Sequence, residues 1–326
     1  MGAGDATADR TARAWPARLH VITGKGGTGK TTVAAALALA LATGGRRTLL
    51  VEVEGRQGIA QLFDTPPLPY EERHIATAPG GGEVRALAVD PEAALLEYLD
   101  MFYRLGAAGR ALRKFGAIDF ATTIAPGLRD VLLTGKVKEA TTRTVGHRRV
   151  YDAVILDAPP TGRIGRFLNV TAETARLAKV GPIKTQSEGV AALLHSPMTA
   201  VHIVTLLEEM PVQETLDAIA ELTALGIPVG RVIVNATRKP LRTARITQAE
   251  LRRGLAAAGL PTDRATVTGL LAEARDYLAR QALEESLRND LVAAGLPLVE
   301  LPLLPQGVDR AGLDTLAEAL RSSHPA

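Results

Sequence analysis

The sequence predicts an α/β protein with a doubly wound, mostly parallel sheet and an inserted α-helical subdomain. Short apolar runs alternate with helical patterns along the chain, which is the order of elements in a doubly wound fold. Several runs are apolar throughout, such as "AVIL" and "VIV", as expected for parallel strands buried on both faces. Right-handed crossovers through the intervening helices would bring these strands into one sheet.

The expected strands are the apolar runs that lie between helical patterns. In chain order they are Leu19–Thr23, Thr48–Val53, Arg85–Val89, Tyr151–Leu156, Ala200–Leu206, Arg231–Asn235 and Leu298–Leu301.

One region interrupts the alternation of strands and helices. After the third strand, Asp90 and Pro91 have the form of a helix N-cap followed by proline at the first helical position, and apolar residues then recur at helical spacing. Ordinary crossover helices are one explanation, but a single crossover rarely needs so many residues. We therefore expect a helical subdomain on one side of the sheet, formed by about 90–148 and 165–198.

Composition excludes several classes of function. The chain has 326 residues, 46% of them hydrophobic and 22% charged, which is typical of a globular protein. Its net charge is +3 and its aromatic content 3%, so we expect no nucleic-acid partner. No apolar run is long enough for stable membrane insertion, and residues 1–17 lack the apolar core of a secretory signal. We expect those residues to form a flexible tail and the protein to be cytoplasmic.

The absence of cysteine narrows the chemistry further. With no cysteine in the chain, disulfides, thiol catalysis and thiol-bound zinc or metalloid are all excluded.

The stretch "VITGKGGTGKTT" satisfies two phosphate-binding patterns at once. Gly24, Gly26 and Gly29 fit the dinucleotide pattern G-x-G-x-x-G, whereas Gly24, Gly29, Lys30 and Thr31 fit the P-loop G-x-x-x-x-G-K-[ST]. Both patterns require a preceding strand and a following helix, and this stretch offers both. The loop alone therefore does not separate NAD binding from ATP binding.

A second motif decides between them. Glu52 and Glu54 could serve the ribose of a dinucleotide, so they do not exclude NAD. However, only triphosphate binding gives a role to Lys30, on the β- and γ-phosphates, and to the Thr31 hydroxyl, on Mg²⁺. The stretch "AVILDAPPTGR" then places Asp157 at the end of a buried strand, where a Walker-B carboxylate holds Mg²⁺. We therefore predict an ATP and Mg²⁺ site and reject the NAD alternative.

The predicted phosphate contacts follow from this choice. Glycines allow backbone N–H groups to form an anion-binding nest at the helix N-terminus. Gly162, which follows the prolines after Asp157, is expected to contact the γ-phosphate. The loop contacts are expected at Gly26, Gly27, Thr28, Gly29, Lys30, Thr31 and Thr32.

Lys25, directly after the first glycine, makes this a two-lysine or deviant Walker-A loop. With it, the chain resembles the arsenite-pump ATPase and the tail-anchored-protein-targeting ATPase, and most closely their actinobacterial relatives. The resemblance covers about Arg18 to Leu320, and it implies one P-loop ATPase domain over 18–326. The stretches that carry it are "GKGGTGKTT", "LLVEVEGRQGIAQLF", "DAPPTG", "EEMPVQET", "VIVN" and "LPLLPQGV".

The resemblance implies further roles at matching positions. Glu54 aligns with a switch-one aspartate that orients the attacking water, although here the carboxylate is one methylene longer and the usual Asp-Pro-Ala-His run is Glu-Gly-Arg-Gln. Asn235 matches the amide that reads adenine, but an asparagine at a strand end is also a common turn residue. Pro302 and Leu303 match the loop that packs on the base.

Lys25 is the residue from which the resemblance implies a dimer. In the family resembled, this lysine crosses a two-fold interface to the nucleotide of the other subunit, in the manner of an arginine finger. The resemblance thus implies a Mg-dependent ATP hydrolase in a homodimer, or in a heterodimer with a paralogous ATPase. It would act on a client at the helical subdomain, a protein or small molecule that the sequence does not identify. The altered switch-one run leaves a second function open, that of a low-turnover regulatory or scaffold subunit.

Overall fold

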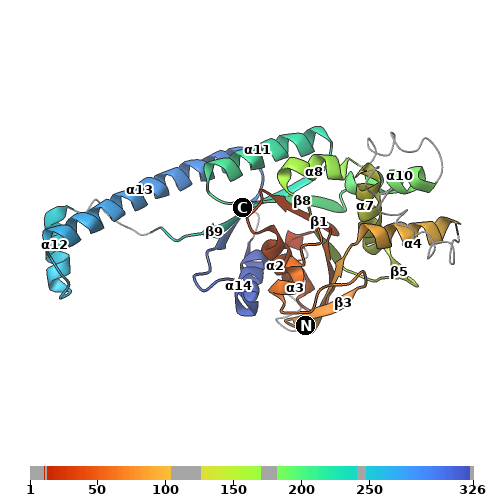
Figure 1. The fold of residues 1–326 in the computed structure, drawn as a ribbon, viewed down its shortest axis with the longest axis horizontal. Helices are drawn as coiled ribbons and strands as arrows, with labels where there is room; N and C mark the ends of the chain where they lie inside the picture. Colours follow the sequence, from red (N-terminus) through yellow and green to blue (C-terminus); the bar gives the residue numbers. More distant parts are fainter. Residues whose placement is uncertain (1–10, 12, 104–125, 170–181, 241–246, 324–326) are drawn as a thin grey trace.

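A computed structural model gives the fold of the chain (Figure 1). It describes all residues except 1–10, 12, 104–125, 170–181, 241–246 and 324–326.

An eight-stranded sheet forms the centre of the protein, in the strand order β10-β9-β8-β1-β7-β2-β4-β3. All neighbouring strands are parallel except β3 and β4, which are antiparallel. The seven expected strands are all present, and the doubly wound, mostly parallel α/β fold is confirmed. The strands of this sheet are β1 (Leu19–Gly24), β2 (Arg47–Glu52), β3 (Arg73–Ala78), β4 (Gly82–Ala88), β7 (Ala153–Asp157), β8 (Thr199–Thr205), β9 (Val229–Thr237) and β10 (Leu298–Pro302).

Helices cover both faces of this sheet, which explains why the central runs of several strands are apolar throughout. Successive residues of a strand point to opposite faces. In β1, Val21 belongs to the core that is shared with α8 and α11, whereas Ile22 packs in the core that contains α2 and α14. The helices of the described residues are α2 (Lys30–Ala42), α3 (Gly58–Leu62), α4 (Pro91–Tyr103), α7 (Pro126–Thr142), α8 (Thr161–Leu168), α10 (Pro182–Leu194), α11 (Glu209–Ala224), α12 (Gln248–Ala257), α13 (Arg264–Ala293) and α14 (Arg310–Ser322).

Helices α4, α7 and α10 gather at one end of the sheet (Figure 1). Helix α7 contacts both α4 and α10. These helices lie in the segments expected to form a helical subdomain, although residues 104–125 and 170–181 of those segments lie outside the described part of the chain. A small hairpin, β5 (Thr144–Val145) with β6 (Arg148–Arg149), ends the first segment. The division into subdomains remains a prediction.

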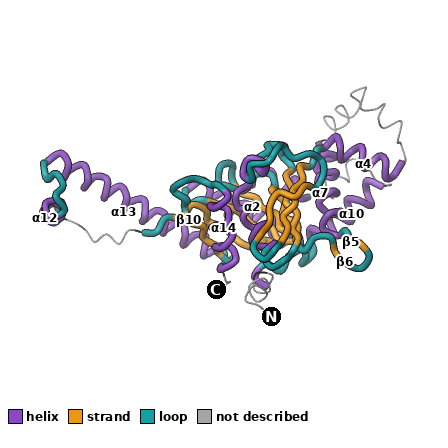
Figure 2. The backbone as a smooth tube through the Cα atoms, turned by 90° about the horizontal axis from the view of Figure 1, so that it is seen from below, coloured by secondary structure: helices purple, strands orange, loops and turns teal. Residues whose placement is uncertain are grey.

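A second helical region was not expected from the sequence. Helices α12 and α13 form an arm that projects from the opposite end of the body (Figures 1 and 2). Helix α13 has 30 residues, and its buried side chains are Val267 near α12 and Leu287 and Leu291 near the body. Among the helices that the structure describes, none is both long and apolar enough to cross a bilayer.

The expected N-terminal tail needs a correction in its last part. Trp15 is buried, with 3% of its surface exposed, and its Nε1 donates a hydrogen bond to the Leu320 carbonyl over 3.2 Å. The Arg231 guanidinium lies 4.7 Å from the Trp15 ring. Burial of this aromatic ring fixes the chain just before β1, so the residues from Trp15 onward belong to the folded domain.

Trp15 covers a pair of fully buried histidines on neighbouring strands. His20 Nδ1 and His202 Nε2 are 3.0 Å apart, and the backbone N–H of Arg231 donates to His202 Nδ1 over 3.1 Å. Because His202 Nδ1 accepts that bond, its proton is on Nε2 and is donated to His20. Both rings are therefore neutral. Burial, with Arg46 and Arg231 nearby, lowers the pKa of His20 to about 4. Burial, with His20 and Arg231 nearby, lowers the pKa of His202 well below its usual value.

This pair predicts a loss of stability in mild acid. An unfolded histidine takes up a proton below about pH 6.5, whereas the folded pair stays neutral to much lower pH. The free energy of unfolding should therefore fall as pH drops from 6.5 toward 4, by on the order of 3 kcal/mol for His20 alone. Urea unfolding at several pH values would measure this. His20→Gln should flatten the slope and the exposed His74→Gln should not; equal slopes in both variants would contradict the assignment.

Candidate functional site

The loop after β1 has the backbone of a phosphate-binding nest. Gly24, Gly27 and Gly29 have φ of 152°, 89° and 90°, values that favour glycine. A side chain at Gly24 would also collide with the Val204 carbonyl of β8. Helix α2 begins after Gly29 with no side chain capping its first turn. The first N–H groups of this apolar, buried helix are thus directed at the loop, where they can bind an anion.

The position of the loop in the sheet agrees with a ligand site. Strand β1 lies between β7 and β8, and the chain crosses from one side of β1 to the other between these two strands. In open α/β sheets, ligands bind beyond the carboxyl ends of the strands at such a switch point. The carboxyl ends of β1 and β7 meet here, because Ile22 pairs with Asp157 in the parallel ladder.

Asp157 and Thr31 form the centre of the site. The Thr31 hydroxyl donates to Asp157 Oδ2 over 2.6 Å, and Asp157 Oδ1 is buried without a hydrogen-bond partner among the described residues. Burial raises the pKa of Asp157 to about 6. A buried carboxylate oxygen without a partner, beside a hydroxyl at a helix N-terminus, is an oxygen ligand set that fits Mg²⁺. These two residues would hold the ion if it binds.

Lys30 extends across the loop in front of this pair. Its Nζ donates to the Lys25 carbonyl over 3.3 Å, and burial lowers its pKa. The ammonium thus lies within the nest itself, where it can meet a phosphate as a point charge.

Lys25 has a partner that sequence reasoning did not identify. Its ammonium forms an ion pair with Glu214 of α11. Glu214 also accepts a hydrogen bond from the Thr161 hydroxyl over 2.8 Å, and these two donors hold its pKa below the ordinary value. Glu214 lies within the "EEMPVQET" stretch that supports the resemblance, but no local pattern connects it to a lysine 189 positions away.

Glu54 lies between two arginines at the edge of the site. One carboxylate oxygen is 3.5 Å from Arg56 and the other is 3.5 Å from Arg163 in the first turn of α8. A polar cavity of about 220 Å³ adjoins Glu54 and is also lined by Arg129 of α7. The sequence predicted Glu54 but neither of its arginine partners.

A second carboxylate, Glu52, is adjacent to the Mg²⁺ candidate. It pairs with Asp157 in the ladder between β2 and β7, and 2% of its surface is exposed. One of its oxygens accepts from the Ile59 N–H over 3.4 Å, and the other is buried without a hydrogen-bond partner in the described structure. From the sequence, Glu52 was considered only as a ribose ligand, but the fold places it beside Asp157 of the candidate Mg²⁺ site.

Asn235, Pro302 and Leu303 are the residues expected around the base, and Gly162 is the residue expected at the γ-phosphate. Asn235 lies against Gly29, and its Nδ2 donates to the Thr28 carbonyl over 2.9 Å. The Leu303 N–H donates to the Thr237 carbonyl over 2.8 Å, which fixes the loop after Pro302 beside the end of β9.

Leu303 keeps 40% of its surface exposed beside this loop, and the space around the Cα of Gly162 is open. Of the predicted site residues, the structure brings Thr31, Asp157, Lys30, Lys25 and Asn235 together at the P-loop. The roles expected of the loop residues, including Thr32, remain predictions.

Known proteins share this sequence pattern over most of the chain. A family model described as an anion-transporting ATPase matches residues 17–195, more than half of the chain. The chain is 56% identical over 321 residues to the ATPase BagA of Mycobacterium tuberculosis (strain ATCC 25618 / H37Rv), which covers 94% of each chain.

More distant relatives match a smaller share of each sequence. The ATPase GET3 of Kluyveromyces lactis is 27% identical over 247 residues, covering 65% of this chain and 70% of the relative. An arsenical pump-driving ATPase of Escherichia coli is 26% identical over 274 residues, covering 74% of this chain and 43% of that protein. The expected resemblance, including its actinobacterial branch, is confirmed. With its P-loop fold and nucleotide-binding motifs, this chain belongs to the anion-transporting ATPase family.

Proposed function

We propose that the protein is a Mg-dependent ATP hydrolase that acts as a dimeric nucleotide switch in the cytoplasm. The observation that carries this proposal is the contact between Thr31 and Asp157 at the P-loop, with the second Asp157 oxygen buried and without a hydrogen-bond partner among the residues that the structure describes. A buried carboxylate of this kind is costly unless an ion or a donor completes its environment.

Each residue of the site then has a defined task. Backbone N–H groups after Gly29 bind the phosphates, and Lys30 adds a positive charge inside the nest. Thr31 and Asp157 hold Mg²⁺, which supplies stabilisation of the charge that develops on the transferred phosphoryl group. Glu54 orients the attacking water through one carboxylate oxygen.

Helix α7 offers a path from the nucleotide to a client. Arg129 and Leu133 of α7 line the polar cavity beside Glu54, while Leu132 and Gly135 of the same helix face the cluster formed with α4 and α10. A change at the γ-phosphate that moves this helix would alter the helical cluster as well. In this proposal the helical cluster binds the client.

A low-turnover regulatory subunit of a heterodimer is the second candidate. It is favoured by Glu54, whose two oxygens are each 3.5 Å from an arginine, so that both are engaged in ion pairs. The measurement that separates the two candidates is release of phosphate from ATP, with Mg²⁺ and with EDTA. Steady Mg-dependent turnover supports the hydrolase, and its absence with and without a co-purified paralogue supports the regulatory subunit.

Lys25 tests the dimeric switch. In the described state its ammonium is paired with Glu214, so it must leave this partner to reach a second subunit. Lys25→Ala is expected to keep near-normal ATP affinity and to lose both ATP-driven dimer closure and hydrolysis, because the charge acts in trans. Light scattering with and without ATP measures closure, and phosphate release measures hydrolysis.

Matched variants give this test its controls. Glu214→Gln removes the partner and should leave closure intact, and Lys239→Ala changes an exposed lysine on the segment after β9. Mixing Lys25→Ala with a Glu54 variant should give non-additive activity if each site borrows a residue from its neighbour. Normal closure and turnover in Lys25→Ala would show that the trans mechanism is wrong.

A further inference from the structure

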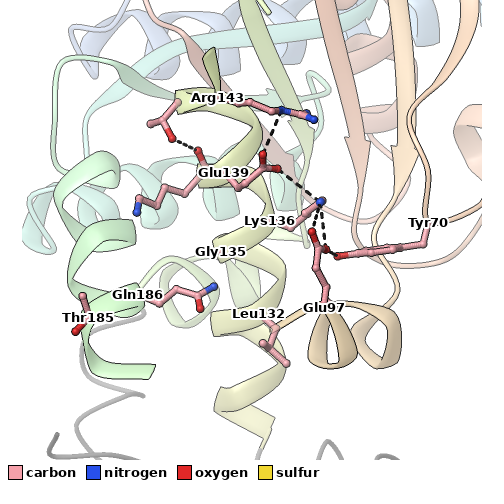
Figure 3. A pocket seen from close by; sticks show the side chains of 12 residues that line it. Tyr70, Glu97, Leu132, Gly135, Lys136, Glu139, Arg143, Thr185 and Gln186 are labelled. Atoms are coloured by element: carbon pink, nitrogen blue, oxygen red, sulfur yellow. Dashed lines mark hydrogen bonds and ion pairs between the residues drawn. The ribbon is translucent and has the colours of Figure 1, made fainter. Parts of the chain in front are cut away.

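A second cavity lies in the helical cluster (Figure 3), and none of the residues that line it belongs to the P-loop. Its volume is about 370 Å³, within the range of small-molecule sites. Helix α7 forms one wall with Leu132 and Gly135, α4 contributes Ala94, and α10 contributes Gln186. Leu132 and Ala94 are both buried core residues, so the inner part of the cavity is apolar.

One rim of the cavity is a closed network of ion pairs. Lys136 Nζ lies 2.8 and 3.1 Å from the two oxygens of Glu97, which also accepts a hydrogen bond from the Tyr70 hydroxyl. Glu139 lies between Lys136, at 3.6 Å, and Arg143, at 3.2 Å. Every charge of this rim thus has an opposite charge beside it (Figure 3).

The rim between α7 and α10 is different, because two of its polar groups lack a counterpart. Lys138 lines the cavity with its Nζ packed over α10, 2.7 Å from the position that a Cβ on Gly189 would take. Within the described part of the chain, no carboxylate lies within ion-pair distance of this ammonium. Gln186 packs against Gly135, and its Oε1 is buried without a hydrogen-bond partner in the same part of the chain.

We propose that this cavity binds a small organic carboxylate with an aliphatic body and a hydroxyl group. The carboxylate pairs with Lys138, a lining charge that has no opposite charge beside it in the described part of the chain. The hydroxyl donates to Gln186 Oε1, which otherwise stays buried and unsatisfied. The aliphatic body fills the space beside Leu132 and Ala94. This inference does not rest on the proposed hydrolase, because binding at the cavity can be measured without nucleotide and therefore separately from ATP hydrolysis.

Calorimetry of the full chain with 3-hydroxyoctanoate as the probe tests the proposal. We expect saturable binding of 3-hydroxyoctanoate, weaker binding of octanoate, which lacks the hydroxyl, and no measurable binding of 1-octanol at the same concentrations. Lys138→Gln should weaken binding of the probe by about tenfold or more, because it removes the charge at nearly constant size. Lys184→Gln is the matched control, since Lys184 is exposed on α10 and pairs with Glu188 rather than lining the cavity.

A variant that fills the cavity separates a loss of probe binding from a loss of folding. Ala94→Phe should abolish binding of the probe while ATP affinity stays unchanged, which shows that the domain is folded. Equal affinity for 3-hydroxyoctanoate and 1-octanol would overturn the proposal, and so would wild-type affinity in Lys138→Gln or the absence of saturable binding. Failure of ATP turnover with intact probe binding would count against the proposed hydrolase and leave this site in place.

Discussion

Lys30→Ala is expected to abolish ATP binding. The Lys30 ammonium lies inside the nest formed after Gly29, where its Nζ donates to the Lys25 carbonyl. Lys25, the second lysine of the loop, is directed to Glu214 on α11 instead. A charge-assisted contact with phosphate at this position therefore has no substitute in the variant.

Titration calorimetry with Mg-ATP measures this effect, and Lys25→Ala gives the matched control from the same loop. We expect the Lys25 variant to bind ATP nearly as well as wild type, and the Lys30 variant to show no measurable heat. Circular dichroism should give the same spectrum for both variants, since neither side chain belongs to a hydrophobic core. Undiminished affinity in Lys30→Ala would remove the P-loop assignment.

Glu54→Gln should leave ATP bound and slow hydrolysis by about 10²-fold or more. The substitution keeps the shape of the side chain and removes the charge that would orient and polarise the attacking water. In the structure that charge lies 3.5 Å from both Arg56 and Arg163, so its position is set from two sides. The Gln variant would lose both ion pairs together with the catalytic charge.

Single-turnover phosphate release separates these effects from binding. Arg56→Gln leaves the Glu54 carboxylate present but held only by Arg163, so we expect a smaller loss of rate than in Glu54→Gln. Glu71→Gln, on an exposed side chain of the loop before β3, should turn over as wild type does. If Glu54→Gln hydrolyses ATP at the wild-type rate, another group orients the water.

Features that depend on neighbours along the chain could be predicted from the amino-acid sequence. The runs "AVIL" in β7 and "VIV" in β9 are apolar because both of their faces are buried, so their composition alone locates them. The P-loop can be recognised from its closely spaced glycines, because its backbone has positive φ angles at Gly24, Gly27 and Gly29. Asp157 follows directly from the end of a buried strand. Each of these signals lies within about a dozen residues.

Features that depend on contacts between residues far apart in the chain could not be predicted from the sequence. Glu214 contacts Lys25, and Arg163 contacts Glu54, because the folded sheet brings α11 and α8 to the P-loop. The sequence around a charged residue on a helix surface does not indicate which distant residue it will pair with. Strand β3 has a half-exposed pattern because it is the antiparallel edge of the sheet.

The arm formed by α12 and α13 and the cavity beside Lys138 also depend on how distant segments of the chain pack. Helix α13 has little periodic apolar signal because few of its side chains are buried along its length. The cavity beside Lys138 exists only where α4, α7 and α10 pack against each other, since its lining comes from three separate segments. Packing between elements far apart in the chain determines these features, and no local pattern specifies it.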